Sequence, residues 1–258
     1  MRICGADFSG AKSPQLALAV GQLEGDHLTI EHVHPCDDRL DLFALIAFSA
    51  NGPQLCGLDF PFRLPAAALA RLGVQELHEL AFSLSREAFA DQVEQALGRY
   101  EGRCAVPSLY CRQTDAVCGA YSGVKRINPS LVQMLYSGSK LLWYLWDDGV
   151  MTYPCHAPAL CQVCEVYPSH TWRAVGMRRT RDMRAFVDAF NALGLLQVTL
   201  PEAYAVVDTQ DVADSIVACV TTAAVQARDD IYTDWSKPSF AAEAEWAVAR
   251  DEGIIVRI

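Results

Sequence analysis

Five acidic residues of this sequence stand where a metal ion or a phosphate could be bound. Asp7 and Asp59 each end a short apolar run, and Glu165 lies near the end of a third. Asp211 and Asp214 are three residues apart, which places both on one face of a helix. Ligands of open α/β sheets collect at the carboxyl ends of the strands. These positions therefore predict a cluster of acids at one edge of a sheet.

A cluster of carboxylates has limited chemistry, because the charges repel each other unless they are protonated or bound to a cation. Oxygen ligands alone favour Mg²⁺ or Mn²⁺. Two such ions ~3.5–4 Å apart can activate water and stabilise the leaving oxygen in phosphodiester hydrolysis. Each acid also has a structural interpretation: a strand-end aspartate often forms a turn, and Asp211 complements the helix dipole.

The elements that must position these acids indicate an α/β fold in one domain spanning residues 1–258. Strands are expected at 2–8, 15–23 and 27–34, and their short connections indicate an antiparallel meander. A helix at 38–50 leads to a fourth strand, 54–60, which should run parallel to the first. A helical insertion at about 61–150 precedes a fifth strand, 160–167, and a short strand closes the chain at 253–258. Helices are also expected at the following ranges: 65–72, 75–100, 128–147, 180–193, 209–228 and 240–250.

The composition is that of a folded protein rather than a disordered or membrane-spanning one. The chain has 258 residues, of which 52% are apolar and 20% charged, which indicates a folded core. No apolar run approaches the ~20 residues of a membrane span. With no export signal recognised, we expect a soluble, cytoplasmic protein that binds no membrane. The sequence leaves the oligomeric state open and allows a dimer.

The order and motifs of these elements resemble the ribonuclease H-like fold. The Asp211/Asp214 helix is similar to the closing helix of RuvC-type resolvases. Further motifs resemble a family of predicted ribonuclease H-like nucleases, domain-of-unknown-function family 429: LDFPFRLP at 58–65, EVYPS at 165–169 and EGII at 252–255. The first turn departs from that family, which more often has glycine soon after the aspartate, then a Cys-Arg type sequence.

The resemblance implies a mixed five-stranded sheet in the order 3-2-1-4-5, with the helical insertion between strands 4 and 5. It implies a metal-dependent nuclease that uses a two-metal mechanism. Glu165 would be a pocket residue that ligates metal or orients water. The implied metal ligands are Asp7, Asp59, Asp211 and Asp214.

Positive charge is concentrated in one place, although the net charge is −10. Arginines 173, 178, 179, 181 and 184 fall within twelve residues and could form a local basic patch that holds a nucleic-acid backbone. The alternative is a solvated helix start whose arginines pair with neighbouring acids. The predicted substrate-binding residues are Ser9, Lys12, Arg173, Arg178 and Arg179.

Ten cysteines are many for a cytosolic protein. We expect buried thiols rather than disulfides. Cys155, His156, Cys161 and Cys164 have a spacing that could ligate zinc. However, residues 161 and 164 lie on one predicted strand, where residues three apart face opposite sides. We therefore do not expect zinc there.

Two other functions stay open on the same residues. An actin-like or sugar-kinase-like phosphotransferase or ATPase could use the Asp7-Phe8-Ser9-Gly10 turn as a phosphate loop, although that fold usually has two domains. A non-catalytic protein could instead use the helical insertion to bind a partner. ATP-dependent stabilisation would favour the first, and inertness toward all nucleic-acid substrates the second.

Overall fold

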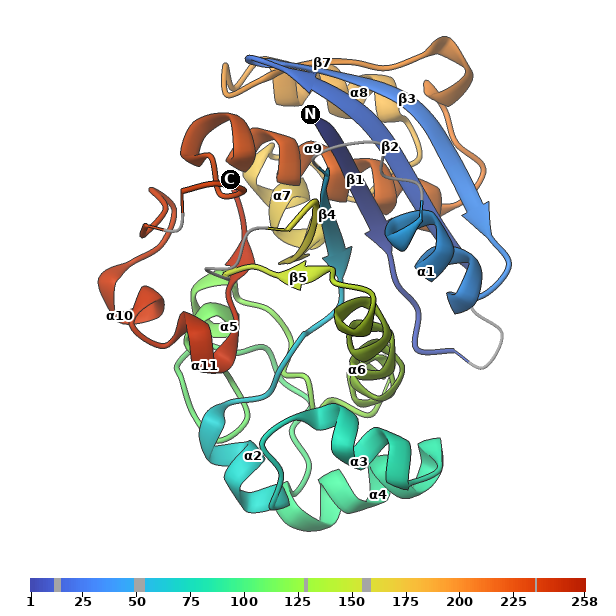
Figure 1. Cartoon of the computed structure of the whole chain (residues 1–258). Helices are drawn as coiled ribbons and strands as arrows, with labels where there is room; N and C mark the ends of the chain where they lie inside the picture. The colour runs from blue at the N-terminus through green and yellow to red at the C-terminus, as the bar shows by residue number, and fades with distance from the viewer. Residues whose placement is uncertain (12–14, 49–53, 128–129, 155–158, 235) are drawn as a thin grey trace.

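The computed structural model describes residues 1–11, 15–48, 54–127, 130–154, 159–234 and 236–258. It has a mixed β-sheet with helices on both faces (Figure 1), which confirms the α/β class. Within the described residues the sheet has eight strands in the order β5-β6-β4-β1-β2-β3-β7, with β8 paired to β6. The strands are β1 (Arg2–Asp7), β2 (Leu16–Glu24), β3 (His27–Cys36), β4 (Gln54–Asp59), β5 (Met151–Thr152), β6 (Cys161–Val166), β7 (Gln197–Thr199) and β8 (Ile255–Val256).

Strand directions follow the lengths of the connections. The short connections on either side of β2 allow it to run antiparallel to both β1 and β3. A helix separates β3 from β4, and β4 returns parallel to β1, with β6 parallel to β4. The expected count of five strands is wrong. The short strands β5 and β7 add to the two edges, and β8 forms part of the strand expected at the C-terminus.

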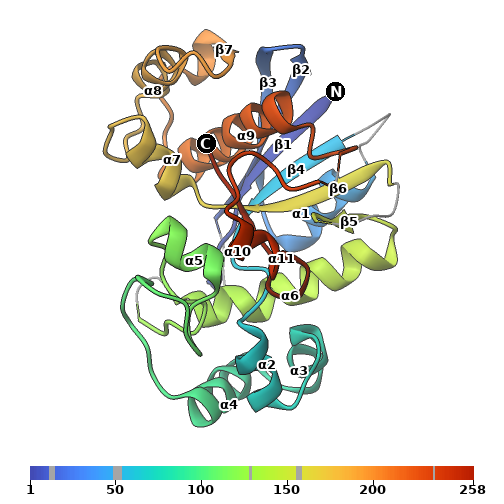
Figure 2. The same cartoon turned by 90° about the vertical axis from the view of Figure 1, so that its left-hand side faces the viewer.

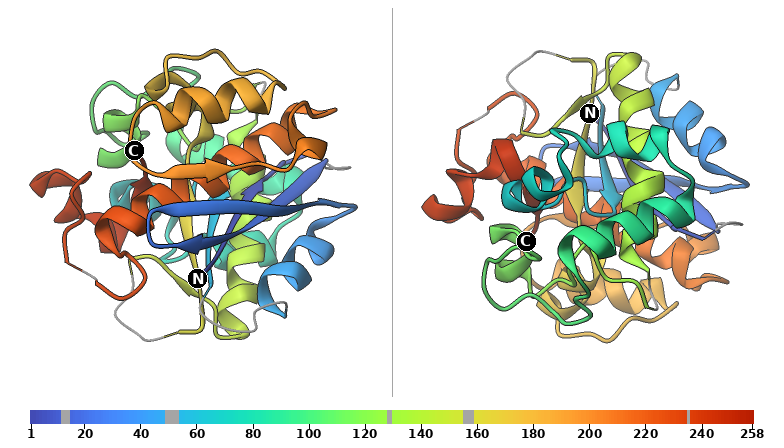
Figure 3. Two further views of the ribbon diagram at one scale, coloured as in Figure 1. Left: turned by 90° about the horizontal axis from the view of Figure 1, so that it is seen from above. Right: turned by 90° about the horizontal axis from the view of Figure 1, so that it is seen from below.

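Helices cover the two faces of the sheet in separate layers (Figures 2 and 3). One apolar core joins one face of the sheet to α7 (Pro168–Ala174), α8 (Met183–Asn191) and α9 (Gln210–Asp229). A second core joins the other face to α1 (Arg39–Ala47) and α6 (Leu131–Asp147). Side-chain caps begin three of these helices: Asp38 accepts from two backbone amides of α1, Asp182 from one of α8 and Thr209 from one of α9.

Between β4 and β5 the chain is helical, as expected, and lies beyond the ends of β1 and β4 (Figure 1). Its helices before α6 are α2 (Ala66–Leu72), α3 (Leu77–Ser83), α4 (Arg86–Leu97) and α5 (Gln113–Cys118). The single helix expected at 75–100 is wrong, because Ser85 caps a new helix by accepting from the Ala88 amide. Helices α2, α3 and α4 share with α6 an apolar core that includes Phe89, Val93 and Leu135.

Two further expected helices have different outcomes. The expected start of α6 at Asn128 and Pro129 lies outside the described residues, and the helix runs from Leu131. The helix expected at 240–250 is instead two single turns, α10 (Glu243–Trp246) and α11 (Ala249–Glu252). A 3₁₀ turn, η1 (Glu202–Tyr204), precedes α9.

The cysteines correct one expectation. Cys104 and Cys111 form a disulfide, with their Cα atoms 5.6 Å apart, because the irregular segment after α4 turns back on itself. The seven other described cysteines are buried thiols. Cys161 and Cys164 lie in the two different cores, on opposite faces of the sheet, so they cannot share one ion. Cys155 and His156 lie outside the described residues.

Removing this disulfide is expected to lower the free energy of unfolding by about 2 kcal/mol, because the bond closes a short loop in the unfolded chain. Urea unfolding of the Cys104→Ser/Cys111→Ser double variant measures the loss. Reductant should bring the wild type to the level of the variant and leave the variant unchanged. Equal stability of oxidised wild type and variant would contradict the bond.

No helix among the described residues is long and apolar enough to cross a membrane.

Candidate functional site

Asp7 and Asp59 stand side by side at the carboxyl ends of two central strands. They are partners in the parallel register of β1 and β4, and paired residues of adjacent strands point to the same face about 4.8 Å apart. Asp7 is only 8% exposed. Both acids line a pocket of about 640 Å³ beyond these strands. The predicted convergence of these two acids is thus present in the structure.

Asp211 reaches the same pocket from the first turn of α9. The helix can lie directly on the sheet because Gly5 and Gly57 have no side chains. A Cβ on Gly5 would come within 2.0 Å of the Cys219 backbone nitrogen, and one on Gly57 within 2.1 Å of the Thr222 hydroxyl. This close approach brings Asp211 beside Asp7, and the protonated form of Asp7 can donate a hydrogen bond to it.

Asp7 and Asp59 lie in an environment that opposes the ionisation of their carboxyl groups. Burial, followed by repulsion from Asp59 and Asp211, raises the pKa of Asp7 well above its ordinary value. Burial also raises the pKa of Asp59 to about 7. The guanidinium of Arg179 acts in the opposite direction on both. A further positive charge placed between these acids would stabilise their ionised forms.

Asp214, predicted as a metal ligand, lies below this pocket rather than in its lining. It is 1% exposed, accepts a 2.8 Å hydrogen bond from the Trp172 indole and another from Gln210, and forms an ion pair with Arg179. The Arg179 side chain is half exposed and lines the pocket. Asp214 therefore anchors the one arginine of the predicted basic patch that reaches the acids.

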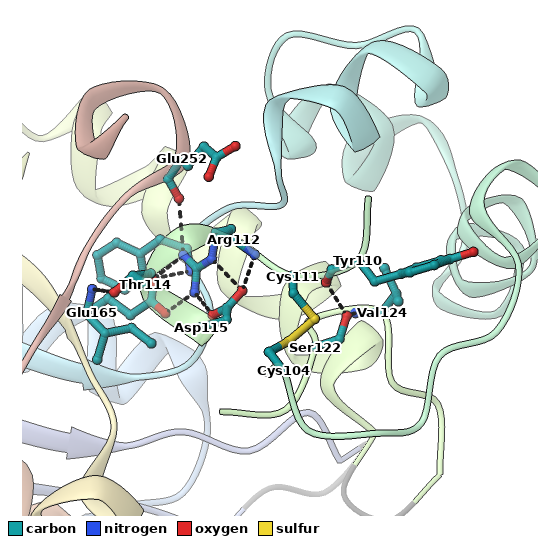
Figure 4. Close-up of polar contacts among 12 residues, drawn as sticks. Cys104, Tyr110, Cys111, Arg112, Thr114, Asp115, Ser122, Val124, Glu165 and Glu252 are labelled. Atoms are coloured by element: carbon teal, nitrogen blue, oxygen red, sulfur yellow. Dashed lines mark hydrogen bonds and ion pairs between the residues drawn. A yellow bond between two sulfur atoms is a disulfide. The ribbon is translucent and has the colours of Figure 1, made fainter. Parts of the chain in front are cut away.

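Glu165 lines the same pocket, as expected, but its side chain leaves the sheet on the opposite face from that of Asp59. Its register partner is Leu58, the residue before Asp59, and successive residues of a strand point to opposite faces. The Glu165 carboxylate accepts two hydrogen bonds from the Arg112 guanidinium, one of 2.7 Å, and one of 2.9 Å from the Phe62 amide. Asp115 binds the same guanidinium (Figure 4).

This buried network ties the pocket to the C-terminal segment. Arg112 is 1% exposed and donates to the Glu252 carbonyl, and the Thr114 hydroxyl accepts from the Ile255 amide (Figure 4). The Glu165 side chain is thus engaged in joining three segments, which fits a structural role better than metal ligation. The sequence contained no signal for this pairing, because 53 residues separate Arg112 from Glu165.

Of the remaining predicted substrate-binding residues, some line the pocket and others do not. Ser9 lines the pocket with Gly10 and Ala11, whereas Lys12 lies outside the described residues. Arg173 donates to the Cys118 carbonyl. Arg178 is exposed and is absent from the pocket lining.

The two arginines beyond this group pair elsewhere, Arg181 with the Asp208 carbonyl and Arg184 with Glu202. Of the basic patch, only Arg179 therefore faces the acids.

As the described side chains stand, no three of the Asp, Glu, His and Cys groups are placed to hold a metal ion together. The donor chemistry nevertheless fits one. Asp7, Asp59 and Asp211 supply only carboxylate oxygens, line one pocket and carry more negative charge than Arg179 balances. Hard divalent cations prefer such oxygen ligands. The residues thus fit Mg²⁺ or Mn²⁺, with Asp211 rather than Asp214 as the helix-borne ligand.

Comparison with protein-family models, curated proteins and solved structures finds no match to this chain. The resemblance to predicted ribonuclease H-like nucleases therefore stays a prediction, and the function must be argued from the site.

The raised pKa of Asp59 predicts a pH-dependent stability. Between its ordinary pKa of 3.8 and about 7, the folded state keeps a proton that the unfolded chain has lost. The free energy of unfolding should therefore fall as the pH rises from about 4 to about 7, by on the order of a few kcal/mol. Urea unfolding in EDTA across this range measures it. The Asp59→Asn variant should show a shallower fall, and an unchanged slope would contradict the assignment.

Proposed function

We propose that this protein is a metal-dependent nuclease or phosphodiesterase. One observation carries the proposal: Asp7 and Asp59 stand in register at the ends of two parallel central strands, with Asp211 beside Asp7. Burial and mutual repulsion raise the pKa of Asp7 and burial raises that of Asp59. A divalent cation bound between the acids would offset this repulsion and favour their ionised forms. Raised pKa values with a specific cause, in a pocket, are typical of functional sites.

We further propose the ribonuclease H-like fold for the sheet. Its central strands run β3-β2-β1-β4-β6, with the first three antiparallel and the others parallel to β1. This arrangement supports the fold suggested by the sequence motifs. The extra edge strands β5 and β7 lie outside that core order.

In the proposed reaction, Asp7, Asp59 and Asp211 would hold Mg²⁺ or Mn²⁺. Two such ions, when bound, would activate water and stabilise the leaving oxygen. Arg179 is the pocket cation whose charge acts on both Asp7 and Asp59. When metal ions neutralise the acids, the acids attract its half-exposed guanidinium less strongly. The guanidinium can then bind a non-bridging phosphate oxygen. Asp214 and Trp172 would position Arg179 for this contact.

The fold itself supports hydrolysis better than the phosphotransferase alternative. A second sheet domain is absent from the described residues, where the long insertion is helical. The pocket lining includes Ser9 to Ala11, so this turn can border a phosphate in either case. Stabilisation that requires ATP with Mg²⁺, and that Mn²⁺ alone does not provide, would favour the phosphotransferase.

The test compares the purified full-length chain with two single variants on single-stranded, double-stranded, branched and hybrid nucleic acids with Mn²⁺ or Mg²⁺. We expect metal-dependent cleavage by the wild type and at least about 10²-fold slower cleavage by Asp211→Asn. Asp208→Asn is the matched control, since Asp208 is exposed and its side chain is absent from the pocket. Inertness of the wild type toward every substrate, or equal rates for both variants, would overturn the proposal.

A further inference from the structure

The pocket that contains the acids extends to a second group of side chains that hydrolysis itself does not require. Arg103, Tyr121 and Tyr167 all line it together with Asp7 and Asp59. Arg103 and Tyr121 come from the irregular segments on either side of α5 and meet in an isolated antiparallel bridge. Tyr167 follows β6 directly, two residues after Glu165. Three separate segments thus bring these side chains into one pocket.

The three side chains form a layered, positively charged wall. The Arg103 guanidinium carbon lies 4.4 Å from the centre of the Tyr121 ring, and the ammonium of Lys125 lies 4.0 Å from the same ring. Arg103 also donates to the Gly119 carbonyl at 2.7 Å and to the Tyr167 hydroxyl at 3.3 Å. These contacts hold the guanidinium plane in place at the pocket surface.

Arg103 differs from most of the arginines around it in its partners. Arg112, Arg126 and Arg179 each pair with a carboxylate, whereas the described residues provide none for Arg103. Its side chain is exposed, and a guanidinium has five donors. The wall therefore offers a planar face, positive charge and free donors in a pocket whose floor is acidic.

Unstacked nucleobases bind to such a surface. Bases of single strands stack on aromatic side chains and on guanidinium planes, and arginine adds attraction to the π-face. A phosphate without a base has no aromatic ring to stack on the planar face of the guanidinium. The base of an intact duplex is already stacked on its neighbours and would have to flip out to reach the wall. A pocket of about 640 Å³ lies in the range that holds small ligands.

We propose that Arg103, Tyr121 and Tyr167 form a nucleobase subsite, so that the substrate is a single-stranded end or short oligonucleotide with an unstacked base. The inference rests on the proposed function, because it takes the acids of the same pocket as the site of phosphodiester cleavage. The disulfide supports the wall mechanically, since Cys104 follows Arg103 and Cys111 precedes the buried Arg112.

The test measures binding of a 5′-phosphorylated trinucleotide and of the same backbone with abasic residues, by calorimetry in Ca²⁺ and again in EDTA. Wild type is expected to bind the base-bearing form about 10-fold more tightly. Arg103→Lys keeps the charge and removes the plane, so it should lose this preference and keep its affinity for the abasic backbone. Arg99→Lys is the control, because Arg99 pairs with Glu94 on the surface outside the pocket.

Several results would overturn the subsite: equal wild-type affinity for the two forms, a preference retained by Arg103→Lys, or a short blunt duplex bound as tightly as the single strand. If Arg103→Lys fails to fold by circular dichroism, Tyr167→Leu replaces it with the same expectation. Cleavage of the trinucleotide with Mn²⁺ is scored separately. A base preference together with inertness toward every nucleic-acid substrate would reject the nuclease, and cleavage without a base preference would reject only the subsite.

Discussion

Replacing Asp7 by asparagine is expected to abolish metal-dependent cleavage and, at the same time, to make the metal-free protein more stable. The amide keeps the shape of the side chain but cannot ionise. It therefore weakens the metal site by removing one charged ligand, and a loss of at least about 10²-fold in rate is expected. At pH 8 the raised pKa of Asp7 lowers the stability of the folded state, because the unfolded chain ionises this carboxyl freely. Asparagine removes that cost, so the thermal midpoint in EDTA at pH 8 should rise.

Thermal melts with and without Mn²⁺ measure both effects in one experiment. The wild type should be stabilised by Mn²⁺ at pH 8, because ligand binding to the folded state raises its stability. Asp7→Asn should begin from a higher midpoint and show little further rise. Asp208→Asn makes the same chemical change on an exposed aspartate and should behave as wild type. A variant that is less stable than wild type in EDTA, or that cleaves at the wild-type rate, would refute the role of Asp7.

Replacing Gly5 by alanine is expected to displace α9 from the sheet and to lose the metal response with it. The added Cβ would lie 2.0 Å from the Cys219 nitrogen and 2.6 Å from the Ala218 carbonyl carbon, both of the α9 backbone. Backbone of a buried helix cannot yield as a flexible side chain can. The free energy of unfolding should fall by about 3 kcal/mol or more, and Asp211 should move away from Asp7.

The matched control is Gly102→Ala. Gly102 is exposed, and the nearest atom to an added Cβ is 3.5 Å away, so its stability should stay within about 0.5 kcal/mol of wild type. Urea unfolding of both variants, with Mn²⁺ titrated into each, gives stability and metal response together. Gly5→Ala with wild-type stability would show that α9 does not lie directly on β1.

Local pattern alone was enough to locate much of the site. An apolar run ending in Asp7, another ending in Asp59, and short or helical connections between strands predict two acids at neighbouring parallel strand ends. The register of β1 and β4 places them as partners. The helix carrying Asp211 and Asp214 was also predictable from its cap and its apolar residues, and it runs from Gln210 to Asp229.

The sequence could not tell which acid of each pair or strand enters the pocket. Asp211 and Asp214 share a helix face, but Trp172 and Arg179 engage Asp214 from α7 and the loop that follows it. Glu165 lies two residues before the end of its predicted strand; its register partner is Leu58, so it lines the pocket from the other face of the sheet and binds Arg112. The register of strands far apart in the chain is set by how their apolar faces pack together, so the residues around Glu165 alone do not fix it.

The disulfide was missed for a related reason. Cysteine count and the lack of a recognised export signal favoured free thiols, and Cys104 and Cys111 lie in a segment with no periodicity to place them. Their pairing depends on the path of that loop between α4 and α5. The same loop presents Arg103 to the pocket, which the sequence also did not indicate.

What the sequence determined by itself is the set of groups that a site could use: strand-end aspartates and an acid-bearing helix, with no lysine-containing phosphate loop or serine nucleophile motif. These features are local, because a strand end or a helix cap depends on a few neighbouring residues. Only the tertiary structure decided which acids face each other and which ones arginines neutralise. Charges interact through space rather than along the chain, so the contacts of Arg179 with Asp214 and of Arg112 with Glu165 exist only once β1, β4, β6 and α9 have packed together.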